Sequence, residues 1–383
     1  MRDSATAPVA LQPIPLIDLP AQRARLGNKV EVAIGRVLAH GQYIMGPEVF
    51  EAERRLSAHC GARHVITCAS GTDALVMGLM AMGIERGDAV FVPSFTFTAT
   101  AEAVVLVGAT PVFVDVHADT YNLDAASLER AIQVAQQTGL KPACVIPVDL
   151  FGQPTDYDAI KSVADKHDLW LLDDAAQSYG ARYRNRALGT CADITATSFY
   201  PSKPLSCYGD GGALFTNDDE MAKRLTQIRV HGQSKDRNDV ARVGLTGRFD
   251  SIQAAVLLEK LAIFDDECAA RAKAAERYST ALSDVVTTPR VLPDCTSVWA
   301  HYTITSPRRD RIVAGLQAQG IGTAVFYAKP VHEQTPYRGY PVSATGLPVT
   351  NRLAQEAMCL PMHPYLTADA QDRVIAAVRA ALA

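Results

Sequence analysis

The chain has 383 residues, of which 48% are hydrophobic and 20% charged, and these proportions exclude a disordered or low-complexity protein. Its 37 basic and 41 acidic residues give a formal net charge of −4, so the chain as a whole does not attract nucleic acid or an anionic membrane surface. Because this length exceeds the usual size of a single hydrophobic core, we expect one large domain and one smaller domain.

The amino-terminal stretch and the cysteines indicate the compartment. Residues 1–19 are broken by Pro8, Pro13 and Pro15 and contain no apolar run of signal-peptide length. The longest apolar-rich tract, residues 90–114, is interrupted by prolines, a glycine and a glutamate, which favours strand, helix and strand over a membrane span. The eight cysteines form no Cys-x-x-Cys pair, so neither a zinc ribbon nor a disulfide framework is indicated. We expect a soluble, cytoplasmic protein.

From about Glu48 to Phe215, short β-rich runs alternate with amphipathic segments. This alternation predicts an α/β domain with a largely parallel sheet. The predicted strands cover residues 64–67, 89–92, 111–114, 143–146, 170–173 and 194–197. The segments between them predict crossover helices at residues 73–82, 99–106, 123–137 and 157–167.

A long helical pattern runs from Arg248 to about Leu282, and Pro289 and Pro293 end it. We place the domain boundary inside this stretch. Residues 1–260 are expected to form the large α/β domain together with an amino-terminal arm, and residues 261–383 a small α+β domain. The small domain should contain a strand at residues 299–305 and helices at residues 310–319 and 368–382.

The segment 69–75 follows a predicted strand and opens a predicted helix. Gly71 permits a tight turn there, and the amides of Thr72 and Asp73 would point outwards, so the segment can bind an anion such as phosphate. A plain helix start capped by Ser70 or Thr72 is the alternative, and capping preferences alone favour it.

Two carboxylates, Asp173 and Asp174, stand at the carboxyl end of an apolar strand, where open α/β sheets bind their ligands. Metal binding, a hydrogen bond to a ribose and pairing with a protonated pyridine nitrogen are the functional roles open to such an acid. Helix capping by Asp174 is the structural alternative, and this segment alone does not decide between them.

Lys203 follows a predicted strand by a few residues, lies between Pro201 and Pro204, and precedes the glycine-rich run 209–212, which we expect to be flexible. A lysine in an apolar, partly desolvated place loses proton affinity, as a Schiff-base nucleophile requires. Most lysines are instead solvated loop residues, so Lys203 gains importance only from the two segments described above.

Together the three segments offer backbone amides for a phosphate, an acid for a pyridine nitrogen and an amine for an aldehyde. Phosphate, pyridine nitrogen and aldehyde are the three groups by which a protein can bind pyridoxal phosphate. Phe97, after the strand 89–92, could lie against the ring, and the Ser198 hydroxyl could add a phosphate contact. The run 209–212 has neither a Walker lysine nor a G-x-G-x-x-G pattern. No metal site is expected, because metal-ligand spacing is lacking among His231, His301, His332 and His363.

Along nearly its full length the chain resembles the DegT/StrS family of nucleotide-sugar aminotransferases, a branch of the fold-type I pyridoxal-phosphate enzymes. The resemblance rests on motifs that occur in order at residues 17–19, 41–49, 70–75, 93–100, 174–177, 198–203, 209–212, 253–255 and 360–364. It implies an aspartate-aminotransferase-like fold with a mostly parallel central sheet in the large domain and a small carboxyl-terminal α+β domain.

The resemblance also implies site roles. Lys203 would bind the cofactor as an imine, and Asp174 would pair with its pyridinium nitrogen. The other cofactor contacts would be Gln177 at the phenolic oxygen, Phe97 on the ring face, and Gly71, Thr72, Asp73 and Ser198 at the phosphate. Relatives that replace the lysine with histidine are sugar dehydratases, so a lysine here favours transamination.

The family is similar in forming homodimers whose active sites each receive a loop from the partner subunit, and here that loop would be residues 244–248. The chain departs from the family pattern at Thr246, where an asparagine near the neighbouring cofactor phosphate is usual. A second departure is Phe326, which with Tyr327 opens a segment where relatives more often read His-Tyr-Pro-x-Pro near the sugar.

Segments 199–210 and 360–365 most resemble enzymes that aminate UDP-2-acetamido-3-oxo-glucuronate, and the implied amino donor is glutamate. Tyr200, Arg248, Phe326 and Tyr327 would lie on the substrate side, with Arg248 meeting a sugar carboxylate. A different keto-sugar nucleotide stays open because of Phe326. Two other classes also stay open: a lyase or dehydratase with the same cofactor, and a non-catalytic sensor that kept the pocket.

Overall fold

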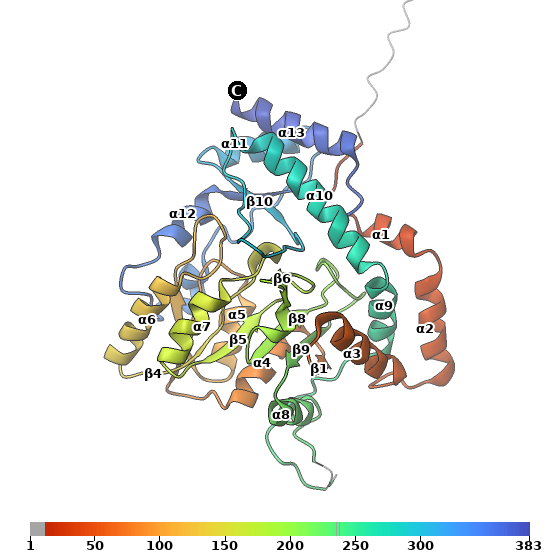
Figure 1. Cartoon of the computed structure of the whole chain (residues 1–383), viewed down its shortest axis with the longest axis vertical. Helices are drawn as coiled ribbons and strands as arrows, with labels where there is room; N and C mark the ends of the chain where they lie inside the picture. Colours follow the sequence, from red (N-terminus) through yellow and green to blue (C-terminus); the bar gives the residue numbers. More distant parts are fainter. Residues whose placement is uncertain (1–11, 235, 237) are drawn as a thin grey trace, which may run out of the picture.

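The computed structural model describes residues 12–234, 236 and 238–383, so the expectations for the stretch that contains Pro8 fall largely outside the described residues. Figure 1 shows a broad part built around a central sheet and a narrower part above it, with the carboxyl terminus at the top. The long helix α10 runs upwards from the broad part into the narrow one.

The central sheet has seven strands in the order β1-β9-β8-β5-β4-β2-β3. Neighbours from β8 to β3 pair in parallel, whereas β9 runs antiparallel to both β1 and β8. The bounds are β1 (His64–Cys68), β2 (Asp88–Pro93), β3 (Thr110–Val114), β4 (Lys141–Val145), β5 (Trp170–Asp174), β8 (Ile194–Ser198) and β9 (Gly212–Thr216). The six predicted strands are present, and β9 was missed because it begins at the last residue of the run that we expected to be flexible.

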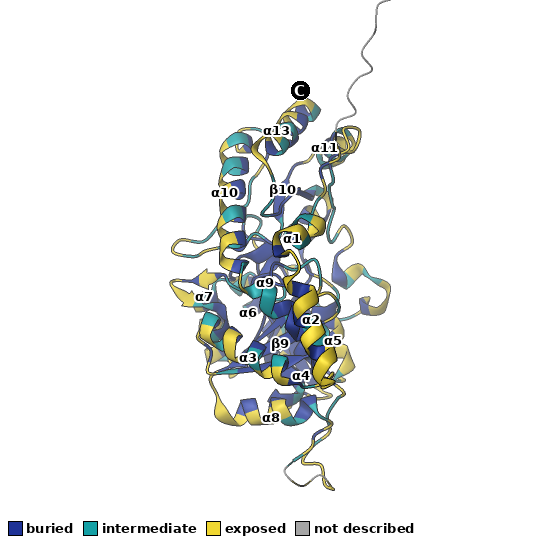
Figure 2. Cartoon of the chain, turned by 90° about the vertical axis from the view of Figure 1, so that its right-hand side faces the viewer, coloured by how far each residue is buried: buried dark blue, intermediate teal, exposed yellow. Residues whose placement is uncertain are grey.

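Helices cover both faces of the sheet, as βαβ crossovers require. One face packs against α4 (Gly71–Met82), α5 (Ala99–Leu106) and α8 (Asp219–Arg229). The other packs against α3 (Pro47–Cys60), α6 (Ala125–Gln137) and α7 (Tyr157–Lys166). In α3, α6, α7 and α8 the face turned to the sheet is buried and the exposed residues lie on the other side (Figure 2), whereas no residue of α4 is exposed. The predicted α/β class with a mostly parallel sheet is confirmed.

The helical stretch predicted from Arg248 to Leu282 is two helices, α9 (Ser251–Leu261) and α10 (Phe264–Leu282). The break follows from packing, because α9 lies against α3 and α2 (Lys29–His40), whereas α10 contacts α13 (Ala368–Leu382) in the narrow part. Asp265, Asp266 and Glu267 in the first turn of α10 favour a new helix start there, since acids stabilise the amino-terminal end of a helix dipole.

The narrow part has its own core, formed by α10, α13, α11 (Arg309–Gln317) and the antiparallel pair β10 (Tyr302–Thr305) and β11 (Ala357–Leu360). Ile14, from the amino-terminal end, belongs to this core, whereas Val331, Tyr337 and Leu347 pack into the core of the large sheet. The division at residues 260/261 stays a prediction. The remaining elements are α1 (Leu19–Leu26), β6 (Arg182–Tyr183), β7 (Arg186–Ala187) and α12 (Pro348–Glu356).

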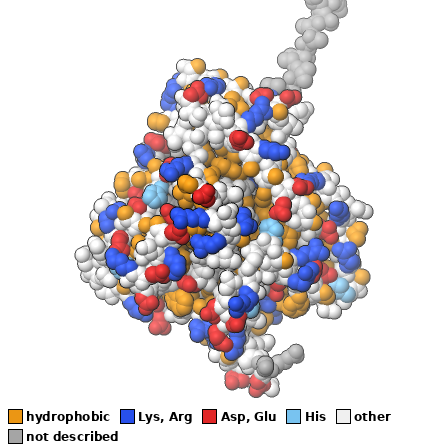
Figure 3. All heavy atoms as spheres, in the orientation of Figure 1, with side chains coloured by type: hydrophobic (Ala, Val, Ile, Leu, Met, Phe, Trp, Pro, Cys, Tyr) orange, Lys and Arg blue, Asp and Glu red, His pale blue; other side chains and the backbone are white. Residues whose placement is uncertain are grey.

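The surface carries basic and acidic side chains interspersed over the face seen in Figure 3. Within the described residues, no helix is long and apolar enough to cross a membrane.

Candidate cofactor site

The predicted site residues gather at one edge of the sheet. The carboxyl ends of β2, β5 and β8 lie at the same edge because these strands run in parallel. The antiparallel strand β9 between β8 and β1 brings the carboxyl end of β1 to that edge as well. The edge therefore holds the turn before Gly71, the loop with Phe97, Asp174 at the end of β5 and Ser198 at the end of β8, which is where such sheets bind ligands.

The turn between β1 and α4 lies directly against Ser198. A Cβ atom on Gly71 would stand 2.6 Å from the Cβ of Ser198, so a larger residue would force the two segments apart. Ser70 caps α4 by accepting a hydrogen bond from the Asp73 amide at 3.0 Å, so this amide, predicted as an anion donor, is engaged in the cap. The amides of Gly71 and Thr72 also belong to the first turn of α4, where the N–H groups at the start of a helix can bind an anion.

Asp174 is a buried carboxylate with only 6% of its surface exposed. Its Oδ2 accepts a hydrogen bond from the Thr100 hydroxyl at 2.9 Å, and its Oδ1 accepts one from the Ala176 amide at 3.2 Å. Burial raises the pKa of Asp174, while these two hydrogen bonds and the charge of Lys203 oppose the rise. The Thr100 contact was missed, because the residue reads simply as a member of the helix α5.

Lys203 lies in a turn after β8, where its amide donates to the Tyr200 carbonyl at 2.8 Å. The side chain is partly buried. Burial lowers the pKa of Lys203, and the negative charge of Asp174 opposes that effect. The lysine thus combines an amine of reduced proton affinity with a nearby acid, as a carbonyl-binding amine requires.

Gln177 joins two aromatic segments across the same edge. Its Oε1 accepts from the Phe151 amide at 2.7 Å, and its Nε2 donates to the Tyr327 hydroxyl at 3.0 Å. The Tyr327 ring is stacked on Phe151, with centroids 6.1 Å apart. Gln177 and Tyr327, predicted as separate cofactor and substrate contacts, are therefore one hydrogen-bonded unit.

His301 is a site residue that the sequence did not reveal. Its ring lies 4.6 Å from the Phe326 ring, centroid to centroid, and edge-on to Phe151. Burial first, and then the charges of Lys203 and Arg271, lower the pKa of His301 to about 3. A neutral imidazole therefore stands near Lys203, where sequence spacing had suggested only a dispersed histidine.

Other predicted residues lie towards the surface. Phe97 and Tyr200 are 59% and 53% exposed, and Arg248 is partly buried. Thr246 is exposed, and its hydroxyl lies 3.0 Å from Nε2 of His231. The Gly247 carbonyl accepts from the Ala69 amide at 3.1 Å, so the loop 244–248 is attached to the turn that precedes α4.

Among the residues that the structure describes, no group of three or more His, Cys, Asp or Glu side chains is arranged to hold a metal ion. An organic cofactor fits the side chains at this edge of the sheet better than a metal ion does. The turn closed on Ser198 suits a phosphate, the buried Asp174 suits a ring nitrogen, and the desolvated Lys203 suits an aldehyde. Fold and site define the class of pyridoxal-phosphate-dependent enzymes.

The pattern of the DegT/DnrJ/EryC1/StrS aminotransferase family matches residues 25–379, and the chain belongs to this family. It is 46% identical over 354 residues to the UDP-2-acetamido-2-deoxy-3-oxo-D-glucuronate aminotransferase of Pseudomonas aeruginosa, with 92% of this chain and 96% of that protein covered. The family is one of aminotransferases, this relative is named as a sugar aminotransferase, and a similar protein is solved with bound PMP cofactor, so the predicted enzyme class and cofactor are confirmed.

Solved structures agree. A DegT/DnrJ/EryC1/StrS aminotransferase from Brucella abortus is 50% identical and superimposes with a TM-score of 0.95 over 96% of this chain and 99% of that one. The ntda protein of Bacillus subtilis, solved with bound PMP cofactor, is 29% identical with a TM-score of 0.87 over 98% of this chain and 86% of that one.

Proposed function

We propose that this enzyme moves an amino group from glutamate to the keto group of a nucleotide-linked sugar, with UDP-2-acetamido-3-oxo-glucuronate as the first substrate to test. The observation that carries the proposal is the meeting of a buried acid, Asp174, and a desolvated amine, Lys203, at the edge that also bears the Gly71 turn. The 46% identical relative named for this sugar supports the choice of substrate.

When bound, pyridoxal phosphate supplies an aldehyde and a ring that accepts electrons. The Lys203 amine would hold the cofactor aldehyde. Its Nζ would also carry the proton that leaves carbon and returns to carbon during the amino transfer. Its lowered pKa favours this role, because a lower pKa increases the uncharged fraction of the amine, which is the form that can accept a proton.

Asp174 would supply the negative charge that keeps the ring nitrogen of the cofactor protonated. Burial alone would favour its neutral form, so the hydrogen bonds from Thr100 and Ala176 help to retain the carboxylate. The Gly71 and Thr72 amides and the Ser198 hydroxyl would hold the phosphate.

Two further side chains would contact the ring. Gln177 would face the phenolic oxygen, held in place by Phe151 and Tyr327. Phe97 would cover the face of the cofactor ring, and the exposed aromatic surface of Phe97 would then stack on that ring.

Tyr200, Arg248, Phe326 and Tyr327 would lie on the sugar side. A half-buried guanidinium suits a sugar carboxylate, because its planar fork can donate two parallel hydrogen bonds. His301 adjoins Phe326, so it brings a polar ring next to the position where relatives more often have histidine.

We infer that the enzyme acts as a homodimer with shared active sites. Large apolar side chains are exposed on one stretch of the chain, with Val32 51%, Leu38 57%, Ile44 50% and Phe50 54% exposed. Ile44 pairs with Asp250, just after the loop 244–248 that is predicted to enter the partner's site. These four side chains come from α2, α3 and the segment between them, and a group of large apolar side chains exposed together typically marks an interface. We also propose that the enzyme is cytoplasmic and that its large domain ends at residue 260, with the small domain beginning at residue 261.

The test is to incubate the cofactor-loaded enzyme with glutamate and a panel of keto-sugar nucleotides, and to measure 2-oxoglutarate and the aminated sugar. We expect both products in equal amounts, with the 3-oxo-glucuronate sugar used best. Sugar consumption without 2-oxoglutarate would indicate a dehydratase. No turnover with any member of the panel would favour a sensor and contradict the proposal.

A further inference from the structure

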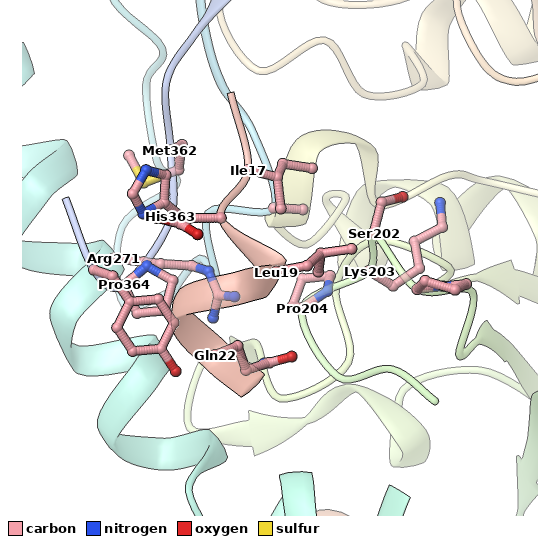
Figure 4. A pocket seen from close by; sticks show the side chains of 14 residues that line it. Ile17, Leu19, Gln22, Ser202, Lys203, Pro204, Arg271, Met362, His363 and Pro364 are labelled. Carbon is pink, nitrogen blue, oxygen red and sulfur yellow. The ribbon is translucent and has the colours of Figure 1, made fainter. Parts of the chain in front are cut away.

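A pocket lies beside Lys203, between the broad and narrow parts of the molecule. It is small, with about 20 Å³ open to the centres of water-sized atoms, which is enough for a water molecule or one small polar group. The walls come from α1, α10, the turn that bears Lys203, and the segment after β11. Figure 4 shows side chains on opposite sides of this pocket: Arg271 and His363 on one side, Ser202 and Lys203 on the other, and Leu19 and Gln22 between them.

Arg271, on α10, brings an incompletely paired guanidinium to this pocket. The residue is 8% exposed, and its Nη1 has no hydrogen-bond partner within the described part of the chain. Glu267 does not complete it, because the nearest approach of the two side chains is 3.9 Å. The Glu267 oxygens instead accept from Gln22 Nε2, at 3.0 and 3.2 Å, and from the Tyr365 hydroxyl.

His363 presents a second unpaired polar group. It is 4% exposed, and neither ring nitrogen has a partner among the described residues. Burial lowers the pKa of His363, so the ring is neutral and carries one N–H donor. Asp18 also lines the pocket, but its carboxylate is engaged as the cap of α1, where it accepts from the Ala21 amide at 2.9 Å.

Buried donors without partners are costly, and native structures keep them where a ligand completes them. We propose that Arg271 and His363 form a carboxylate subsite that holds the side-chain carboxylate of a dicarboxylic amino donor. This inference rests on the proposed function, since an aminotransferase needs a place for its donor. The planar guanidinium fork suits a carboxylate better than other small groups.

The position of the pocket favours the donor over the sugar as the source of the carboxylate. The Lys203 side chain runs along the opposite side with its amine at the far end, so a donor held at Arg271 extends along it towards the amine (Figure 4). The charges of Lys203 and of Arg271 both lower the pKa of His301, so both cations lie near this one residue.

The test compares the Michaelis constants of the two substrates in a variant that removes the guanidinium. Arg271→Met is combined with Glu267→Gln, because removing Arg271 alone would leave a buried carboxylate without its neighbouring cation. We expect KM for glutamate to rise by about tenfold or more, the usual effect of losing a hydrogen bond to a charged group, while KM for the keto-sugar nucleotide changes by less than about twofold. His363→Leu should act in the same direction.

Two controls bracket this result. Glu267→Gln alone should leave KM for glutamate unchanged, and so should Arg277→Met, which removes an arginine of α10 paired with Asp372 at the surface. A rise in KM for the sugar and none for glutamate would assign the carboxylate to the sugar and overturn the proposal. Unchanged constants for both substrates would overturn it as well.

A binding measurement separates failure of this inference from failure of the proposed function. Glutarate, a dicarboxylate without an amine, is titrated calorimetrically into the cofactor-loaded enzyme and into the double variant. Binding to the parent and at least tenfold weaker binding to the variant support the subsite even if no keto sugar is aminated. Equal binding to both, or none to the parent, contradicts it even if amination is observed.

Discussion

The Thr100 hydroxyl donates a hydrogen bond to Oδ2 of Asp174 at 2.9 Å, which ties the first turn of α5 to the acid at the end of β5. The two residues are 74 positions apart in the chain. This contact opposes the rise in the pKa of Asp174 that burial causes, so it favours the carboxylate that the proposed chemistry needs.

Thr100→Val should therefore reduce activity without preventing cofactor binding. Loss of the hydrogen bond raises the pKa of Asp174 further, so a larger fraction of the Asp174 side chain is neutral. We therefore expect kcat to fall by about tenfold, and to fall more at acidic than at alkaline pH. Thr100→Ser restores the hydroxyl and should recover most of kcat. Thr98→Val, two residues earlier, is the control because its hydroxyl bonds to Tyr337 instead. Parental activity in Thr100→Val across the pH range would show that the contact is structural.

Lys203→Ala should lose the covalent attachment of the cofactor and reduce kcat by at least about a thousandfold, as expected when a covalent catalyst and its proton transfer are both removed. Borohydride reduction of the parent followed by peptide mass analysis should locate the cofactor on the peptide that contains Lys203. Lys223→Ala, at an exposed position of α8, should keep the attachment. Reduced cofactor on another lysine would disprove the assignment.

Gly71→Ala should weaken cofactor binding, because the new Cβ would stand 2.6 Å from the Cβ of Ser198 and open the phosphate turn. We expect the dissociation constant to rise about tenfold or more, measured by fluorescence titration of the cofactor-free enzyme. Gly35→Ala is a matched control, since a Cβ there meets nothing within 4 Å and the residue lies inside α2. That variant should bind cofactor normally and gain up to about 1 kcal/mol of stability from helix propensity. Equal affinities would mean that the turn does not hold the phosphate.

His301 should make the fold sensitive to acid. Its pKa is about 3 in the folded chain against 6.5 for the free side chain, so between these values only the unfolded chain binds the proton. The free energy of unfolding therefore falls as pH drops below 6.5, by at most about 1.4 kcal/mol for each pH unit. Urea unfolding at pH 7 and pH 5 should show a smaller loss for His301→Gln than for the parent. An identical loss in both proteins would place the acid sensitivity elsewhere.

Phe50→Arg should convert the proposed dimer to a monomer, because a charge in place of the exposed Phe50 ring cannot be buried against a partner without a counter-ion. Light scattering measures the mass, and activity should fall with it if the sites are shared. Trp170→Arg is the control, since Trp170 is 40% exposed at the amino end of β5, away from the site edge. A monomeric parent enzyme would contradict the dimer proposal.

Much of the fold follows from local sequence alone. Strands such as residues 89–92 are continuous apolar runs bounded by polar or breaking residues, and the crossover helices repeat their apolar positions at helical spacing, so both types were predicted where they occur. The glycine-led strand β9 and the break between α9 and α10 were not predicted, because each depends on which distant element the segment packs against.

The sequence by itself determined the cofactor chemistry, because the Gly71 turn, Asp174 and Lys203 occur together on one chain whose ordered motifs resemble a known family, although none of the three decides its role alone. Only the tertiary structure decided which other side chains act on these groups. Thr100 reaches Asp174, the charge of Lys203 lowers the pKa of His301, and Arg271 lines a pocket, because strands and helices distant in the chain are packed together. Burial and the distance to a charge set the pKa of a group, and neither quantity is a property of neighbouring residues in the sequence.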